Sequence, residues 1–437
     1  MRSKRLTTGN VPALVACPTA AGTLAAVRTL GRAGVPVSVC GERGLNATRL
    51  SRFAHSYWTF ESTRSEADFL NGLRRWGKHS AKHVLLPGSD ETAWLFAKHR
   101  DELRRDFTVY APSLDIVESI IDKERLWHAC NTAGLATLPS WFPQTLSDIT
   151  RASLEADFPV VIKPRQHLFR TRRRKGVVVG SAAELEREFV DFARREQSKG
   201  RESKAGQPLP AIQSFVENAV ENVLSITGFI DRSGTRSIAS AARKVLQRSR
   251  PVGVGLAFES VAVPDGVADA VLKLCHQIGF FGIFEIELVW HDGAWRVIDF
   301  NPRFYQEMAL DIARGIPLPL LAYLDACEKL DELDEVLAAA RMHACRAMGF
   351  TDMFTTTLML ALRLIRNPTA TRDAIVWHWR YRRALVDATF DARDPLPFLA
   401  HALCELLLGI EEFPRLFMEA RLPQTRSQAP LEYETIE

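Results

Sequence analysis

The sequence of 437 residues predicts a mixed α/β and α+β protein, with a Rossmann-like N-terminal domain and a helical C-terminal region. Three observations support this prediction. Over residues 10–114, short apolar runs alternate with amphipathic stretches, as in parallel strands with crossover helices. Residues 280–303 predict an antiparallel hairpin with a tight turn. Beyond residue 317 the segments have mainly helical periodicity.

The N-terminal domain is expected to span residues 10–114. Residues 11–17 (VPALVAC) predict a buried strand, and a turn and helix lead to a second strand at 35–41. Residues 83–103 repeat this strand–helix scheme, and residues 107–113 add a further strand. Short links between such elements are typical of a parallel sheet. There is no G-x-G-x-x-G fingerprint after the first strand, which disfavours a dinucleotide-binding oxidoreductase.

A second domain is expected over residues 115–316. It begins with two helices, the second opening at Asp122-Lys123 and ending at Gly134. Residues 157–165 (DFPVVIKPR) predict a strand, and a long helix follows Ser181. After a polar loop at 196–210 come several strands and a helix that leads into the hairpin.

The C-terminal region, residues 317–425, is expected to form helices, and residues 426–437 a frayed tail. It contains an aromatic and basic run, WHWRYRR at 377–383. We expect this region to pack on the preceding domain and to wall the acceptor-substrate pocket. The alternative is a docking face for a membrane surface or a partner, because Trp and Arg together favour interfaces.

Composition indicates an ordinary soluble protein that is 46% hydrophobic and 25% charged. The net charge of +4 is too small to suggest a nucleic-acid partner, and no specific nucleic acid is expected. Seven scattered cysteines without a C-x-x-C pair predict reduced thiols and a cytoplasmic location. No apolar run approaches the ~18 residues of a transmembrane helix, so no transmembrane segment is expected.

The predicted hairpin contains acidic and amide side chains that predict a metal site. Strand alternation places Glu287 on one face of the first strand, and Asp299 and Asn301 on one face of the second. A three-residue loop at 292–294 would set Glu287 opposite Asp299, whereas a two-residue loop would pair Glu287 with Ile298 and separate the carboxylates. The first register brings three oxygen ligands together, a set that suits Mg²⁺ or Mn²⁺.

These residues resemble the metal-binding end of the ATP-grasp superfamily. There, a Glu is followed twelve residues later by an acid in the pattern acidic-x-Asn-x-Arg, which corresponds here to Glu287, Asp299, Asn301 and Arg303. The second acid is more often Glu, so Asp299 is a departure. The stretches SIIDKERLWHACNTAGLATLPS and FFGIFEIELVWHDGAWRVIDFNPR are most similar to carboxylate–amine ligases and predicted ATP-grasp carboligases. The resemblance covers residues 10–315 and implies a two-subdomain ATP-grasp fold.

The resemblance also implies a nucleotide site. Lys123 and Lys163 match the two lysines that contact the ATP phosphates. Residues 213–216 match the hinge over the adenine, with Phe215 able to pack on the base. Glu221 matches the acid that binds the ribose, with Glu217 as the competing choice. The implied nucleotide-binding residues are Lys123, Lys163, Gln213, Phe215, Val216 and Glu221.

The implied reaction is an ATP-dependent ligation with Mg²⁺ (or Mn²⁺), in which the γ-phosphate activates a carboxylate and an amine then displaces phosphate. Arg303 and Lys163 would stabilise the transferred charge, and Glu307, six residues past Asn301, would serve proton transfer. Arg243 and Lys244 are further candidates to face the γ-phosphate. The alternative function is a nucleotide-binding module with little turnover that recruits a partner through its helical C-terminus.

A basic stretch follows Lys163. From Pro159 to Gly176 there are seven cations and no acid. A phosphate-clamping flap is the preferred interpretation of residues 165–175. A solvated loop and a non-specific RNA contact are the alternatives.

Overall fold

The structure is a computed structural model that describes residues 10–16, 21–42, 46–60, 65–166, 168, 176–197, 208–217, 222–248, 253–343, 346–364 and 368–419. Its N-terminal strands form a parallel sheet in the order β3-β2-β1-β4-β5, which confirms the Rossmann-like prediction. The strands are β1 (Ala13–Ala16), β2 (Val37–Glu42), β3 (Ala54–Phe60), β4 (His83–Leu86) and β5 (Phe107–Val109). The accompanying helices are α1 (Ala21–Arg32), η1 (Thr48–Leu50), α2 (Glu66–Gly77), α3 (Asp90–Lys98) and α4 (Arg100–Leu103).

Helix α1 lies against the chain that leaves the hairpin. A Cβ atom on Gly22 would be 2.0 Å from the carbonyl oxygen of Tyr305, so only glycine permits this approach. The same helix packs on two later helices, α10 (Met308–Ala313) and α11 (Leu318–Ala326). The N-terminal sheet and the segment after the hairpin therefore share one core.

Two linker helices follow, α5 (Leu114–Ile121) and α6 (Lys123–Ala133), as the sequence predicts. The side chain of Asp122 accepts hydrogen bonds from the backbone N–H groups of Glu124 and Arg125, which caps α6. Gly134 ends the helix in the left-handed conformation, with φ +80°. The cap fixes Lys123 at the first position of α6.

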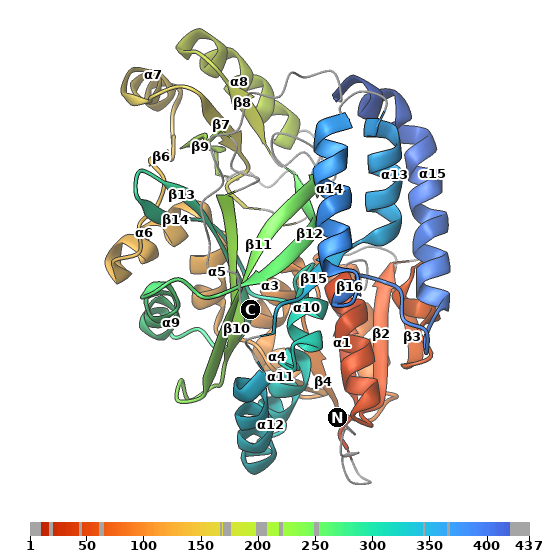
Figure 1. The fold of residues 1–437 in the computed structure, drawn as a ribbon. Coiled ribbons are helices and arrows are strands. Elements are labelled where there is room, and N and C mark those ends of the chain that lie inside the picture. The colour runs from red at the N-terminus through yellow and green to blue at the C-terminus, as the bar shows by residue number, and fades with distance from the viewer. Residues whose placement is uncertain are drawn as a thin grey trace.

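A small sheet follows the linker helices, in the order β6-β9-β7-β8, and it lies with α7 and α8 at the upper left of Figure 1. All of its strand pairs are antiparallel. Its elements are β6 (Ser140–Trp141), α7 (Leu146–Glu155), β7 (Val160–Lys163), β8 (Val177–Val179), α8 (Ala182–Gln197) and β9 (Ala211–Ser214).

A larger sheet, in the order β14-β13-β10-β11-β12-β15-β16, contains the hairpin. Its first strands are β10 (Val223–Ile230), β11 (Ser237–Arg248), β12 (Val254–Val261), β13 (Gly282–His291) and β14 (Ala294–Asn301), with α9 (Val267–Ile278) before the hairpin. The two sheets and their helices give the α/β and α+β architecture that the sequence predicts.

The C-terminal region is helical, as expected, but it also completes the large sheet. Two short strands, β15 (Gly349–Thr351) and β16 (Leu385–Asp387), extend that sheet beyond β12. The helices are α12 (Leu330–His343), α13 (Met353–Leu364), α14 (Pro368–Tyr381) and α15 (Leu396–Glu419). Figure 1 shows α13, α14 and α15 side by side in blue.

A buried ion pair ties this region to the N-terminal domain. Nε of Arg28 on α1 lies 2.9 Å from Oδ2 of Asp394, and Ser51 Oγ donates to the same carboxylate at 2.7 Å. Such a pair fixes the arrangement of the two segments, because separating it would leave a buried charge without a partner. In the described residues, no helix is both long and apolar enough to cross a bilayer.

Candidate active site

The hairpin brings the predicted ligands together, but by a different route from the one expected. The loop has two residues, not three: His291 pairs with Ala294, and Asp292 and Gly293 have φ of +49° and +72°. Positive φ at both positions is typical of a type I′ turn. Ile298 is then the extra residue of a β-bulge, and the bulge restores the pairing of Glu287 with Asp299.

Acidic and basic side chains alternate across the strands at this point. Lys244 Nζ on β11 donates to Glu287 Oε1 at 2.6 Å, and Lys123 Nζ at the start of α6 donates to Asp299 Oδ1 at 2.8 Å. Burial lowers the pKa of Lys244, but the charge of Glu287 and their hydrogen bond outweigh burial and raise it overall. Lys244 is therefore charged, and the hydrogen bonds of the two lysines hold the two carboxylates side by side.

Arg303 is held by three acceptors. Its Nε donates to Asp90 Oδ1 at 2.8 Å, its Nη2 to Asn301 Oδ1 at 2.8 Å and its Nη1 to the carbonyl of Phe304 at 3.0 Å. Asp90 is the first residue of α3, directly beyond the carboxyl end of β4, where ligands commonly bind in open α/β sheets. The N-terminal domain thus fixes the direction of the Arg303 guanidinium.

A buried pair of carboxyls lies beside Asn301. Asn301 Nδ2 donates to Glu285 Oε2 at 3.0 Å, Ser225 Oγ donates to Glu285 Oε1 at 2.9 Å, and Glu285 is hydrogen-bonded to Glu307. Burial raises the pKa of both carboxyls, that of Glu307 to well above its ordinary value, and the charge of the neighbouring carboxyl adds to this. Glu307 Oε1 is buried and has no hydrogen-bond partner among the described residues. This is the arrangement of two carboxyls that share one proton.

The two predicted phosphate lysines line one pocket. It lies between α6, the small sheet and β14, and Lys163 Nζ donates to Gln213 Oε1 there at 2.8 Å. Apolar and aromatic side chains form most of its wall, and Ile298 places it next to Asp299. The lining residues are Lys123, Leu126, Trp127, Cys130, Thr137, Ser140, Phe142, Lys163, Ala211, Gln213, Val297 and Ile298.

The other residues of the predicted adenine hinge and ribose site do not line this pocket in the described part of the chain. Phe215 and Val216 follow β9 but do not line this pocket, and the Phe215 N–H donates to the carbonyl of Pro159 at 3.0 Å. That N–H is therefore already paired within the protein. Glu217 is exposed, and Glu221 lies outside the described residues.

The basic stretch is only partly described. Arg165 Nε lies 3.1 Å from Asp122 Oδ2, and its Nη2 pairs with Glu124. The first arginine of the stretch thus joins β7 to α6 through carboxylates. Residues 167 and 169–175 lie outside the described part of the chain, so the predicted flap is not tested.

Two residues that contact the predicted site residues were not assigned from the sequence, and Arg243 was grouped with Lys244 although the two side chains point in different directions. Asp90 is the first: Ser89 caps α3, which leaves the Asp90 carboxylate to accept from Arg303. Glu285 is the second: it lies two residues before Glu287 on β13, and Asn301 and Ser225 both donate to its carboxyl. Lys244 was considered together with Arg243, but neighbours on a strand face opposite sides and Arg243 pairs with Glu259.

The donor set of Glu287, Asp299 and Asn301 fits a hard divalent cation by its chemistry. All three offer oxygen, they lie on adjacent paired strands, and the two carboxylate side chains are 17% and 24% exposed. Among the described residues no group of three or more His, Cys, Asp and Glu side chains is arranged to hold a metal ion. A metal here would therefore depend on the amide of Asn301 and on bound phosphate as well as on the two carboxylates.

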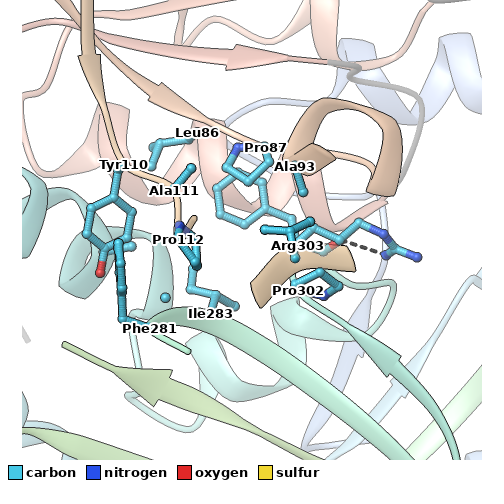
Figure 2. A pocket seen from close by; sticks show the side chains of 14 residues that line it. Leu86, Pro87, Ala93, Tyr110, Ala111, Pro112, Phe281, Ile283, Pro302 and Arg303 are labelled. Carbon is cyan, nitrogen blue, oxygen red and sulfur yellow. Dashed lines mark hydrogen bonds between the residues drawn. The ribbon is translucent and has the colours of Figure 1, made fainter. Parts of the chain in front are cut away.

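A second pocket lies beyond Arg303. Figure 2 shows Tyr110 and Phe281 at one end and Ala93 and Arg303 at the other, with the Arg303 guanidinium directed away from the cavity. Arg303 is its only charged lining residue. Among the described residues, none beyond Ala322 lines either of these two pockets, so the prediction that the C-terminal region walls the acceptor pocket stays a prediction.

No protein-family model matches the sequence, and a search of curated proteins finds no match. Solved structures do match the fold. The biotin carboxylase domain of Hydrogenobacter thermophilus 2-oxoglutarate carboxylase, in complex with MgADP, ADP and bicarbonate, has TM-score 0.58 and 16% identity, covering 72% of this chain and 69% of that one. Campylobacter jejuni biotin carboxylase, in a β,γ-ATP complex, has TM-score 0.58 and 14% identity, covering 72% and 71%.

A third structure, Staphylococcus aureus N5-carboxyaminoimidazole synthetase complexed with ADP, has TM-score 0.55 and 14% identity. The match covers 73% of this chain and 78% of that one. At this level of identity the likeness shows a shared fold.

Proposed function

We propose that this chain, which has the fold of the ATP-grasp superfamily, is an ATP-dependent ligase that joins a carboxylate to an amine with release of ADP and phosphate. The observation that carries the proposal is a row of two lysine–carboxylate pairs and one arginine–amide pair at the hairpin. Lys123 meets Asp299, Lys244 meets Glu287, and Arg303 meets Asn301. Such a surface matches a polyphosphate and its cation, which also alternate in charge.

The nucleotide is proposed to bind in the pocket that contains Lys123 and Lys163. Its apolar and aromatic wall suits a purine base, and the two ammonium groups suit the phosphates. When bound, a Mg²⁺ or Mn²⁺ ion held by Glu287, Asp299 and Asn301 would neutralise charge on the β- and γ-phosphates. Lys123 and Lys244 keep the two carboxylates in place beside it.

In the first step, a carboxylate oxygen of the substrate forms a bond to the γ-phosphorus while the bond to ADP breaks. Arg303, which is hydrogen-bonded to Asp90 and Asn301, would bind the anionic acyl phosphate. In the second step, the amine attacks the carbonyl carbon, phosphate leaves and the amine loses a proton. Glu307 and Glu285, which share a proton beside Asn301, can move that proton.

The experiment that tests this function is ADP release from ATP with Mg²⁺, measured against pools of carboxylic acids and amino acids. The expected result is ADP formation that depends on an added acid, with an amide as the second product. Tight ATP binding without ADP formation in any pool would instead support a nucleotide-binding module that recruits a partner.

Lys163→Ala is expected to weaken ATP binding about tenfold or more, and ADP binding much less, because a hydrogen-bonded charge on the terminal phosphate is lost. Titration calorimetry with each nucleotide measures both constants. Lys273→Ala is the control, since Lys273 is exposed on α9. Equal losses for ATP and ADP would place Lys163 away from the γ-phosphate.

A further inference from the structure

Helix α14 has two unlike faces. Trp377 and Tyr381, one turn apart, are buried, and Trp377 Nε1 donates to Glu259 Oε2 at 2.8 Å. On the other side Ile375, Val376 and Trp379 are 56%, 58% and 68% exposed. Because residues three and four apart lie close on a helix surface, Trp379 is a neighbour of both Val376 and Ile375, and the three exposed side chains form one apolar patch. Figure 1 shows α14 on the outside of the molecule beside α13.

Four arginines lie near this patch in the sequence, two on α14 and two directly after its last residue. Arg372, Arg380, Arg382 and Arg383 are all exposed, and the one exposed acid among residues 372–383 is Asp373. The guanidinium carbon of Arg382 lies 4.3 Å from the centroid of the Trp379 ring, a cation–π contact. Within the described part of the chain, none of the four arginines is in an ion pair with a carboxylate. The patch therefore presents apolar side chains and uncompensated positive charge together.

We propose that this surface, the α14 face (Arg372, Ile375, Val376, Trp379, Arg380, Arg382 and Arg383), binds the surface of an anionic phospholipid membrane. Exposed Trp and aliphatic side chains flanked by arginines are typical of helices that lie in the bilayer interface. The apolar side chains enter the boundary between headgroups and acyl chains, where Trp is favoured. The arginines remain at the level of the lipid phosphates, which supply the missing negative charge.

Charge also decides against a second copy of the chain. A two-fold contact through the α14 face would gather the four arginines of each copy in one interface, and like charges repel. Helix α15 exposes leucines as well, but residues 396–407 contain no arginine, so the charge argument concerns α14 alone. Membrane binding of this kind is reversible and weakens as salt screens the charges.

The test is co-sedimentation of the full chain with vesicles of phosphatidylcholine alone and with about one-third phosphatidylglycerol, at low and high salt. The proposal predicts that the chain pellets with the anionic vesicles, at least about fivefold more than with phosphatidylcholine, and that salt releases it. Arg380→Glu with Arg383→Glu removes the charge attraction, and Val376→Ser with Trp379→Ser removes the apolar contact. Each pair should abolish most of the binding.

Matched controls separate this surface from general effects. Arg187→Glu with Arg194→Glu makes the same change in net charge on α8, where both side chains are exposed, and Leu154→Ser removes an exposed leucine on α7. Both controls should still bind. Absence of pelleting, equal pelleting on neutral vesicles, or binding that survives both α14 pairs would overturn the proposal. A further result would also overturn it: light scattering shows a dimer that Val376→Ser with Trp379→Ser converts to monomer, and the parent does not bind vesicles.

Discussion

Replacing Asp299 with Asn and Asn301 with Ala in one variant is expected to lower turnover by about 10³-fold or more. The variant removes one of two adjacent carboxylates and the amide oxygen beside them. A divalent cation would lose two of its three proposed ligands, and Lys123 would lose the carboxylate that it pairs with. Both side chains are only part-buried, so the fold should survive. ADP release at saturating Mg²⁺ and saturating acid measures the loss.

The matched control is Asp292→Asn. Asp292 lies in the turn of the same hairpin, and 72% of its side chain is exposed. The control therefore makes the same Asp-to-Asn substitution at a position outside the site. Circular dichroism of both variants should match that of the parent. Turnover of Asp299→Asn with Asn301→Ala within a few-fold of the parent would show that the metal assignment is wrong.

Arg303→Lys is expected to lower kcat by about 10²-fold while ATP affinity changes little. The guanidinium satisfies Asp90, Asn301 and the Phe304 carbonyl at once, and a single ammonium group cannot reach all three. The positive charge remains, but its direction toward the transferred group is lost. Steady-state kinetics with the acid varied at saturating ATP separates kcat from KM.

Arg296→Lys provides the control for that experiment. Arg296 is on β14, the strand that leads to Arg303, and its side chain donates two hydrogen bonds, to the carbonyls of His291 and Thr137. It should keep near-parent turnover. If Arg303→Lys is no worse than Arg296→Lys, Arg303 has a structural role in place of a chemical one.

Local signals in the sequence predicted much of the fold. Asp122 and Gly134 were identified as the two ends of α6 because capping and left-handed backbone depend on the residue type itself. Strands β15 and β16 were missed, since each has three residues and a strand of that length shows no period-two pattern within a helical region. Strand β15 pairs with the edge of β12, and β16 pairs in turn with β15.

The site was predictable where it lies within one hairpin, and less so elsewhere. The pairing of Glu287 with Asp299 was expected, but from a three-residue loop, whereas a two-residue turn and a bulge at Ile298 produce it. A bulge has a weak sequence signal because almost any residue can occupy it. Asp90 reaches Arg303 across more than two hundred residues of sequence, a contact that only the packing of the two domains creates.

The central claim is that a carboxylate is activated by transfer of the γ-phosphoryl group. It is tested most directly with the acid that stimulates ADP release, labelled with ¹⁸O in its carboxylate, and mass spectrometry of the phosphate produced. Activation through an acyl phosphate predicts that each phosphate released carries one ¹⁸O from the acid and that the nucleotide product is ADP. Phosphate without ¹⁸O, or AMP with pyrophosphate as the products, would contradict the mechanism proposed for this protein.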